Sequence, residues 1–280
     1  MCELFGVSSK KYVEINEYLE KFYSHSEEHP HGWGLAIMDE NQSIIQKQPV
    51  KASQSEELKK LLSKPISVKN AFAHIRLATM GYMDSFNCHP FIKIDNAGRT
   101  WTLIHNGTIF EYEDLKSYVS KQLGETDSER ILLYIIDQIN DLQDELERKL
   151  NPEECFKLLD NIITDLSEGN KLNVMIFNGE FMYIHTNYRN SLYYLKTEDT
   201  LFISTRPLND ENWRLIPFNR VIGIKDGELV FEGKKHNHEY LITEDQLNFI
   251  MEQLSPSLRE SMKNNFGELY YAKEYRHNNQ

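Results

Sequence analysis

Apolar and polar positions alternate in short runs along the first third of the chain. The runs LFGVSS, GWGLAIM, SIIQKQPV, NAFAHIRLAT and TWTLIHNGTI are bounded by Gly, Asn, Asp or Pro, and such a pattern predicts short β-strands. Strand-like runs return after residue 170, where two turns carry the dipeptides Asn178-Gly179 and Asp226-Gly227. These dipeptides are the strongest short-range indication of a β-hairpin. The runs SLYYLKT and TLFISTRPL, between the two hairpins, predict a further antiparallel pair.

A period of three to four residues replaces this pattern in the middle of the chain. Segments 126–146 and 151–166 carry apolar stripes and begin with Thr126 and Asn151, which are favoured N-cap residues. Segment 244–254 has a similar stripe. The sequence therefore predicts two central helices and a helical tail.

Strands on both sides of a helical centre predict an α+β fold in which antiparallel sheets stack and helices flank them. The chain shows no linker, repeat or low-complexity segment. We therefore expect one domain over residues 2–235. Residues 236–280 are expected to form a helical C-terminal extension packed on or near it.

Composition narrows the class of protein. The formal net charge is -12 and no basic cluster is present, which argues against nucleic-acid and anionic-membrane partners. The three cysteines, Cys2, Cys88 and Cys155, are scattered and odd in number, so a disulfide framework is not expected. No apolar run reaches membrane-spanning length and no signal-peptide pattern is present. These features predict a soluble cytoplasmic protein.

Cys2 directly follows the initiator methionine. Removal of that methionine would leave Cys2 with both a thiol and a free α-amine. The pKa of an α-amine is about 7.7–8.0, so the amine can serve as a base at neutral pH for the thiol beside it. This is the chemistry of an N-terminal nucleophile.

Four further residues suit the recognition and turnover of a free amino acid. Arg76 can hold a carboxylate through two hydrogen bonds, and Asp127 can hold an ammonium group. Asn106 offers a side-chain N–H and Gly107 a backbone N–H, which are the two donors that an oxyanion hole requires.

The motifs MCELFG, HPHGWGLA, AHIRLATMG, NCHPF, IHNGTI and TDSE follow one another in the order found in a known family. In these motifs the chain resembles the class II glutamine amidotransferase domain of the N-terminal nucleophile hydrolase superfamily, and most of all its stand-alone members. The resemblance covers most of residues 2 to about 235. It implies a four-layer αββα sandwich.

The resemblance also assigns roles. Cys2 would be the nucleophile, and Asn106 and Gly107 would form the oxyanion hole. Ammonia would be released from glutamine through a γ-glutamyl thioester, without a metal or an organic cofactor. The substrate-binding residues would be Arg76, Asp127 and Thr79.

One departure from the pattern concerns residue 77. Sugar-phosphate amidotransferases carry Trp after the motif arginine, whereas this chain has Leu77, which puts gating by that loop in doubt. No synthase, isomerase or phosphoribosyltransferase domain is expected in the chain. The ammonia acceptor would then be a separate subunit, or the substrate would be a γ-glutamyl small molecule other than glutamine.

Several alternatives remain open from the sequence. The protein could be a γ-glutamyl hydrolase that acts on a small conjugate, or a catalytically silent sensor that binds glutamine. Cys88 with His89 is a weaker nucleophile pair, because adjacent strand residues point to opposite faces. The crowded histidines suggest a zinc site only weakly, since no pair has a helical ligand spacing. They are His25, His29, His31, His74, His89 and His105.

Overall fold

The computed structural model describes residues 2–39, 42–78, 82–253 and 256. The chain forms two compact units, residues 1–241 and 242–280. In the second unit, helix α5 (Glu244–Gln253) follows Thr243, whose hydroxyl accepts the backbone N–H of Gln246 at 3.2 Å. The expected helix is therefore present. The domain boundary expected between residues 235 and 236 stays a prediction.

Two antiparallel sheets form the centre of the first unit. In the described part of the chain, the first sheet has seven strands in the order β11-β9-β10-β1-β4-β2-β3, and the second has six in the order β13-β12-β8-β7-β6-β5. The first sheet comprises β1 (Glu3–Glu14), β2 (Trp33–Asp39), β3 (Gln42–Gln48), β4 (Ser67–Ile75), β9 (Tyr193–Lys196), β10 (Thr200–Ser204) and β11 (Arg214–Leu215). The second comprises β5 (Phe91–Ile94), β6 (Thr100–Thr108), β7 (Lys171–Phe177), β8 (Met182–His185), β12 (Ile222–Lys225) and β13 (Glu228–Glu232).

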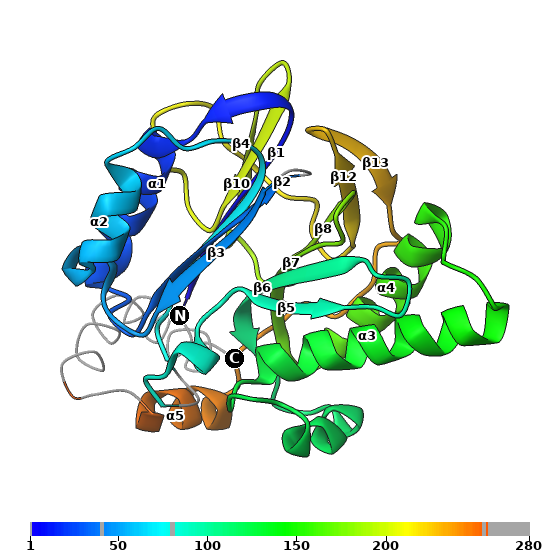
Figure 1. The fold of residues 1–280 in the computed structure, drawn as a ribbon. Coiled ribbons are helices and arrows are strands. Elements are labelled where there is room, and N and C mark those ends of the chain that lie inside the picture. The colour runs from blue at the N-terminus through cyan, green and yellow to red at the C-terminus, as the bar shows by residue number, and fades with distance from the viewer. Residues whose placement is uncertain (1, 40–41, 79–81, 254–255, 257–280) are drawn as a thin grey trace, which may run out of the picture. The chain divides into compact units, whose positions relative to one another are not determined.

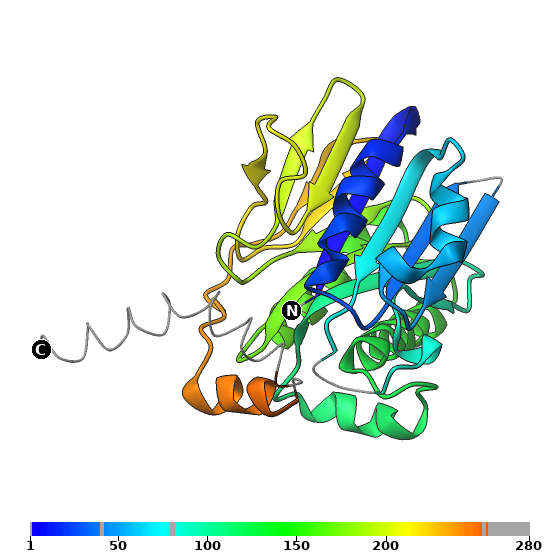
Figure 2. The ribbon, with the colours of Figure 1, turned by 90° about the vertical axis from the view of Figure 1, so that its left-hand side faces the viewer.

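Helices cover the outer faces of both sheets (Figure 1). The first sheet is covered by α1 (Asn16–Ser24) and α2 (Glu56–Leu62), and the second by α3 (Asp127–Leu146) and α4 (Pro152–Leu166). Figure 2 shows the blue helix α1 lying in front of the strands that it covers. The predicted four-layer αββα sandwich is thus confirmed. The short 3₁₀ helices are η1 (His25–Glu27), η2 (Ala52–Gln54), η3 (Ser85–Asn87) and η4 (Glu113–Ser120).

Side chains of each strand alternate between the helices and the opposite sheet. In β1, Phe5 packs with the helix-side core, whereas Leu4 belongs to the core between the sheets. In β7, Val174 faces the helices and Met175 faces the first sheet. The sheets approach so closely that a Cβ on Gly6 would lie 2.9 Å from the Met175 sulfur. This alternation fixes which polar residues can meet between the sheets.

The predicted turns and helix N-caps are confirmed, although the cap of α3 is less complete than that of α4. Gly179 adopts a φ of 91° at the turn between β7 and β8, and Asn151 forms a complete capping box with Glu154 at the start of α4. Thr126 caps α3 by accepting the N–H of Glu129 at 3.3 Å. The Glu129 carboxylate, however, accepts two N–H groups of the preceding loop instead of that of Thr126.

The sequence did not predict helices α1 and α2. Helix α1 has nine residues, and Ile15 at its N-cap makes no side-chain capping bond, so the usual start pattern is missing. Helix α2 has seven residues. Segments this short form mainly through packing against a neighbouring surface. Among the described residues, no helix has the length and apolar character needed to cross a membrane.

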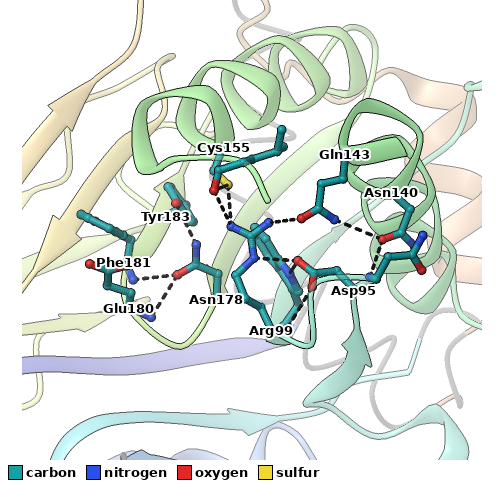
Figure 3. A network of polar contacts seen from close by, with 12 residues as sticks. Asp95, Arg99, Asn140, Gln143, Cys155, Asn178, Glu180, Phe181 and Tyr183 are labelled. Carbon is teal, nitrogen blue, oxygen red and sulfur yellow. Dashed lines mark hydrogen bonds and ion pairs between the residues drawn. The ribbon is translucent and has the colours of Figure 1, made fainter. Parts of the chain in front are cut away.

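Arg99 ties the β5–β6 hairpin to the helices behind the second sheet (Figure 3). Its Nε donates to Asp95 at 2.7 Å, and one Nη donates to Gln143 of α3 at 3.0 Å. The other Nη contacts the Cys155 sulfur of α4 at 3.0 Å and the Leu150 carbonyl oxygen at 3.2 Å. The side chain of Asp95 is 0% exposed. The Arg99 side chain therefore joins the hairpin to two helices.

We expect Arg99→Met to lower the free energy of unfolding by about 3–5 kcal/mol, because it leaves the buried Asp95 carboxylate without its cation. Urea unfolding of the wild type and the variant measures this loss. Arg148→Met is the control, since the Arg148–Glu154 pair lies on the surface and its loss should hardly move the midpoint. Equal midpoints for the two variants would contradict the structural role of Arg99.

Candidate active site

Cys2 lies at the start of β1, next to the end of β4. The register pairs Glu3 with Ile75, so the segment that follows β4 passes beside Cys2. The Cys2 sulfur lies 3.6 Å from the carbonyl oxygen of Leu77 and is only partly buried. Since Cys2 is two residues from Leu4, the alternation of β1 turns it toward the second sheet.

Glu3 anchors the strand that carries Cys2. Its buried carboxylate accepts a hydrogen bond from Nδ1 of His25 at 2.9 Å and forms an ion pair with Arg206. Burial acts to raise the pKa of Glu3, but the hydrogen bond to His25 and the charges of His29 and Arg206 outweigh it, so the pKa is lowered. The start of β1 is thereby anchored through the Glu3 side chain, on the helix side of the sheet.

Arg76 is buried directly after β4. Its backbone N–H donates to the Gly32 carbonyl at 2.8 Å, and its own carbonyl accepts the N–H of His31 at 3.0 Å. Its Nη1 donates to the Tyr82 carbonyl at 3.1 Å. Hydrogen bonds of the Arg76 backbone and of its guanidinium group therefore fix the position of this side chain. Thr79, expected in the same motif, lies outside the described residues.

Asn106 and Gly107 end strand β6 on the second sheet. Asn106 is two residues from Ile104, which packs between the sheets, so its side chain belongs to the inner face. Glycine is required at position 107, because a Cβ there would lie 1.8 Å from the Lys171 carbonyl oxygen and 2.3 Å from Nε2 of His105. The two residues present an amide side chain beside a backbone that carries no side chain of its own.

Asp127 is the first residue of α3 and is buried. One of its carboxylate oxygens accepts the N–H of Ile109 at 2.8 Å, and the other accepts the N–H of Ser128 at 2.8 Å. The helix N-terminus favours this negative charge. Asp127 is thus bonded to the segment that directly follows Gly107 and Thr108.

Lys171 lies between Asn106 of the second sheet and Cys2 beside the first sheet. The sequence alone did not predict a role for it. Its ammonium lies 3.3 Å from Oδ1 of Asn106 and 4.9 Å from the centre of the Tyr188 ring. Burial lowers the pKa of Lys171 from 10.5 to about 7, and a charge on Cys2 acts in the opposite direction. The pattern that could have found it is the alternation of β7, since Lys171 shares a face with Asn173 and Met175.

The other nucleophile and metal hypotheses find less support. Cys88 is buried, and burial raises the pKa of its thiol to about 11, so little thiolate forms at neutral pH. His74 and His89 lie with ring centres 4.0 Å apart, and burial holds both pKa values well below 6.5. Within the described ranges, no three His, Cys, Asp or Glu side chains are placed to hold a metal ion. Cys155 is buried as well.

Comparisons with known proteins identify relatives of this chain. The family model described as class II glutamine amidotransferases matches residues 1–201. An uncharacterized protein of Methanocaldococcus jannaschii is 28% identical over 263 residues, which are 84% of this chain and 72% of that protein.

Solved structures share the fold. The crystal structure of a predicted glutamine amidotransferase from Pseudomonas aeruginosa superposes with a TM-score of 0.56 at 19% identity, covering 82% of this chain and 100% of that one. Glutamine phosphoribosylpyrophosphate amidotransferase from B. subtilis gives a TM-score of 0.58 at 17% identity, covering 82% of this chain and 48% of that one.

The lowered pKa of Lys171 predicts how stability depends on pH. Between pH 7 and pH 10 the unfolded chain binds the proton on Lys171 more tightly than the folded protein does, so this group makes the free energy of unfolding rise with pH. Lys171→Met removes that rise. The free energy of unfolding of the wild type minus that of the variant should therefore rise by about 1 kcal/mol per pH unit across this range.

Urea unfolding at several pH values measures this difference. Lys225→Met is the matched control, because Lys225 also lies near an aromatic ring on the second sheet but pairs with Glu180, which raises its pKa. Its stability difference from the wild type should stay constant between pH 7 and pH 9. A constant difference for Lys171→Met as well would contradict the pKa of Lys171.

Proposed function

The chain belongs to the class II glutamine amidotransferases, and from this membership we propose that it releases ammonia from glutamine with Cys2 as an N-terminal nucleophile. The observation that carries the proposal is the meeting of two sheets at one site: Cys2 is close enough for its charge to act on Lys171, which bonds to Asn106. Cys2, Asn106 and Gly107 are the proposed catalytic residues. No metal or organic cofactor enters the reaction.

In the first step the α-amine of Cys2, freed by removal of Met1, takes the thiol proton. The thiolate sulfur bonds to the side-chain carbonyl carbon of glutamine, and the π electrons move to the oxygen. Asn106 and Gly107 donate hydrogen bonds to this oxyanion. The step requires hydrogen-bond donors facing the carbonyl oxygen of the substrate, and β6 carries both proposed donors.

In the second step the carbon–nitrogen bond breaks and the amide nitrogen leaves as ammonia with the proton held by the α-amine. Cys2 now carries a γ-glutamyl thioester. Water attacks the thioester carbonyl, the α-amine takes the proton of that water, and the carbon–sulfur bond breaks. Glutamate leaves and the Cys2 thiol is restored.

Arg76 and Asp127 are the proposed holders of the substrate's α-carboxylate and α-ammonium groups, and Thr79 is proposed to lie near the substrate. Arg76 is a fixed buried cation after β4, and Asp127 is a fixed buried anion at the start of α3. A pair of opposite charges on two separate elements suits a free amino acid. The three free cysteines suit a reducing compartment such as the cytoplasm.

Cys2→Ala should abolish glutamate release from glutamine while substrate binding persists, since the thiol performs the chemistry and the charge pair performs the recognition. A glutamine analogue with a diazo-ketone in place of the amide should label Cys2. Glutamate assay and peptide mapping measure the two effects, with Cys155→Ala as the control that keeps both. Labelling of Cys88, or hydrolysis by Cys2→Ala, would move the active site elsewhere.

The charge pair predicts strict demands on the α-groups of the substrate. Glutamine methyl ester and N-acetylglutamine each leave one buried charge unpaired, at a cost of about 2–5 kcal/mol. Their kcat/KM should therefore fall roughly 30-fold or more below that of glutamine. In Asp127→Asn the discrimination against N-acetylglutamine should be lost, while the discrimination against the ester is kept.

A γ-anilide and γ-glutamyl dipeptides belong in the same substrate series. A conjugate that exceeds glutamine by an order of magnitude would identify the protein as a γ-glutamyl hydrolase. Tight binding of glutamine without turnover of any compound would identify a sensor. Ammonia release that rises when a second protein is added would point to a separate accepting subunit. Equal rates for blocked and free glutamine would contradict the roles of Arg76 and Asp127.

A further inference from the structure

Lys171 is an unusual residue for its position. It begins β7, a strand whose other side chains are buried and mostly apolar, and its own exposure is 3%. Taking an ammonium group out of water is costly. Its Nζ donates to Oδ1 of Asn106 at 3.3 Å, and the Tyr188 ring lies beside it. A buried cation at this place calls for a role that an apolar residue could not fill.

We propose that Lys171 is a positioning residue of the active site: it holds the Asn106 amide with its N–H donors toward the substrate, and its positive charge attracts the ionised sulfur of Cys2. This inference rests on the function proposed above. It adds a residue that none of the sequence motifs contains, and it explains why one particular orientation of Asn106 is maintained.

The orientation argument follows from donor and acceptor chemistry. An asparagine amide has nearly the same shape when its oxygen and nitrogen are exchanged, so packing alone fixes its orientation poorly. An ammonium group donates only and can face only the amide oxygen. Because Lys171 faces Oδ1 of Asn106, the amide nitrogen points away from it. An oxyanion requires a nitrogen donor, not an oxygen.

The charge argument follows from the coupling between Lys171 and Cys2. Cys2 and Lys171 both lie on inner faces of the two sheets, Cys2 two residues from Leu4 and Lys171 four residues from Met175. A negative charge on Cys2 acts to raise the pKa of Lys171, and because two charges act on each other equally, the ammonium attracts a negative charge on Cys2. The groups packed against Lys171 include the Tyr188 ring and His105. Burial lowers the pKa of His105 while Asp127 acts to raise it, and Nε2 of His105 donates to the Lys171 carbonyl at 3.3 Å.

Two substitutions separate the two parts of the role. Lys171→Met removes both the donor and the charge. Lys171→Gln removes the charge but keeps an N–H donor for Oδ1 of Asn106. Lys225→Met is the control on the same sheet, since Lys225 also lies near an aromatic ring, that of Phe181. Circular dichroism and thermal melting check that each variant is folded.

The first measurement is glutamine hydrolysis in a double-mutant cycle with Asn106→Ala. Lys171→Met should lower kcat by roughly tenfold or more with little change in KM, and Lys171→Gln should recover part of that loss. In the Asn106→Ala background the effect of Lys171→Met should shrink markedly, because the amide that it orients is gone. Full additivity of the two substitutions would overturn the orientation role.

The second measurement is the rate at which iodoacetamide alkylates Cys2 at neutral pH, read by peptide mass. It needs no catalytic turnover. Lys171→Met and Lys171→Gln should both slow alkylation by roughly threefold or more, because the cation that attracts the thiolate is gone, whereas Lys225→Met should match the wild type. Unchanged alkylation in both Lys171 variants would overturn the charge role.

The two measurements keep the inference distinct from the proposed function. A wild-type protein that hydrolyses no glutamine or γ-glutamyl compound, yet loses Cys2 reactivity in the Lys171 variants, would refute the proposed function and support the coupling of Lys171 to Cys2. An active wild type whose Lys171 variants keep full kcat and full Cys2 reactivity would refute the inference alone.

Discussion

The alternation of side chains along a β-strand decides which polar residues meet in this protein. Cys2, Arg76, Asn106 and Lys171 are each two or four residues from an apolar side chain that packs between the two sheets. That spacing places all four side chains on the inner faces of the sheets, near one end of the sandwich. A shift of one residue in any of these strands would turn its polar residue toward the helices. The antiparallel registers of β1 with β4 and of β6 with β7 are therefore part of the active-site geometry.

Strand β6 shows how the fold supports such a site. Near its first residues, Arg99 ties the chain to α3 and α4 through buried polar contacts. Its last residues carry Asn106 and Gly107, and Asp127 at the start of α3 bonds to the segment that follows. Strand β6 and helix α3 are thus connected by hydrogen bonds near both ends of the strand. A site that must hold hydrogen-bond donors within a fraction of an ångström of a reacting oxygen benefits from this double attachment.

The sequence predicted the parts of the fold that depend on local chemistry. Asn151 and the Asn178-Gly179 turn act through bonds within a few residues, so their roles can be read without knowing the fold. Helix α1 could not be predicted in the same way, because it forms against the first sheet and lacks a capping side chain. Lys171 was missed for a related reason. A lysine at the start of a strand is usually exposed, and the alternation of β7 gives its face but not its burial, which follows from the packing of the two sheets.

In the proposed reaction a glutamyl group is transferred to the sulfur of Cys2 while its α-amine is free. Acid quenching of the wild-type protein mixed with glutamine, followed by mass spectrometry of its peptides, tests this transfer directly. We expect an N-terminal peptide that begins at Cys2, carries one glutamyl group and loses it to hydroxylamine, as a thioester does. A glutamyl group on Cys88 or Cys155, or on an N-terminal peptide that retains Met1, would contradict this mechanism.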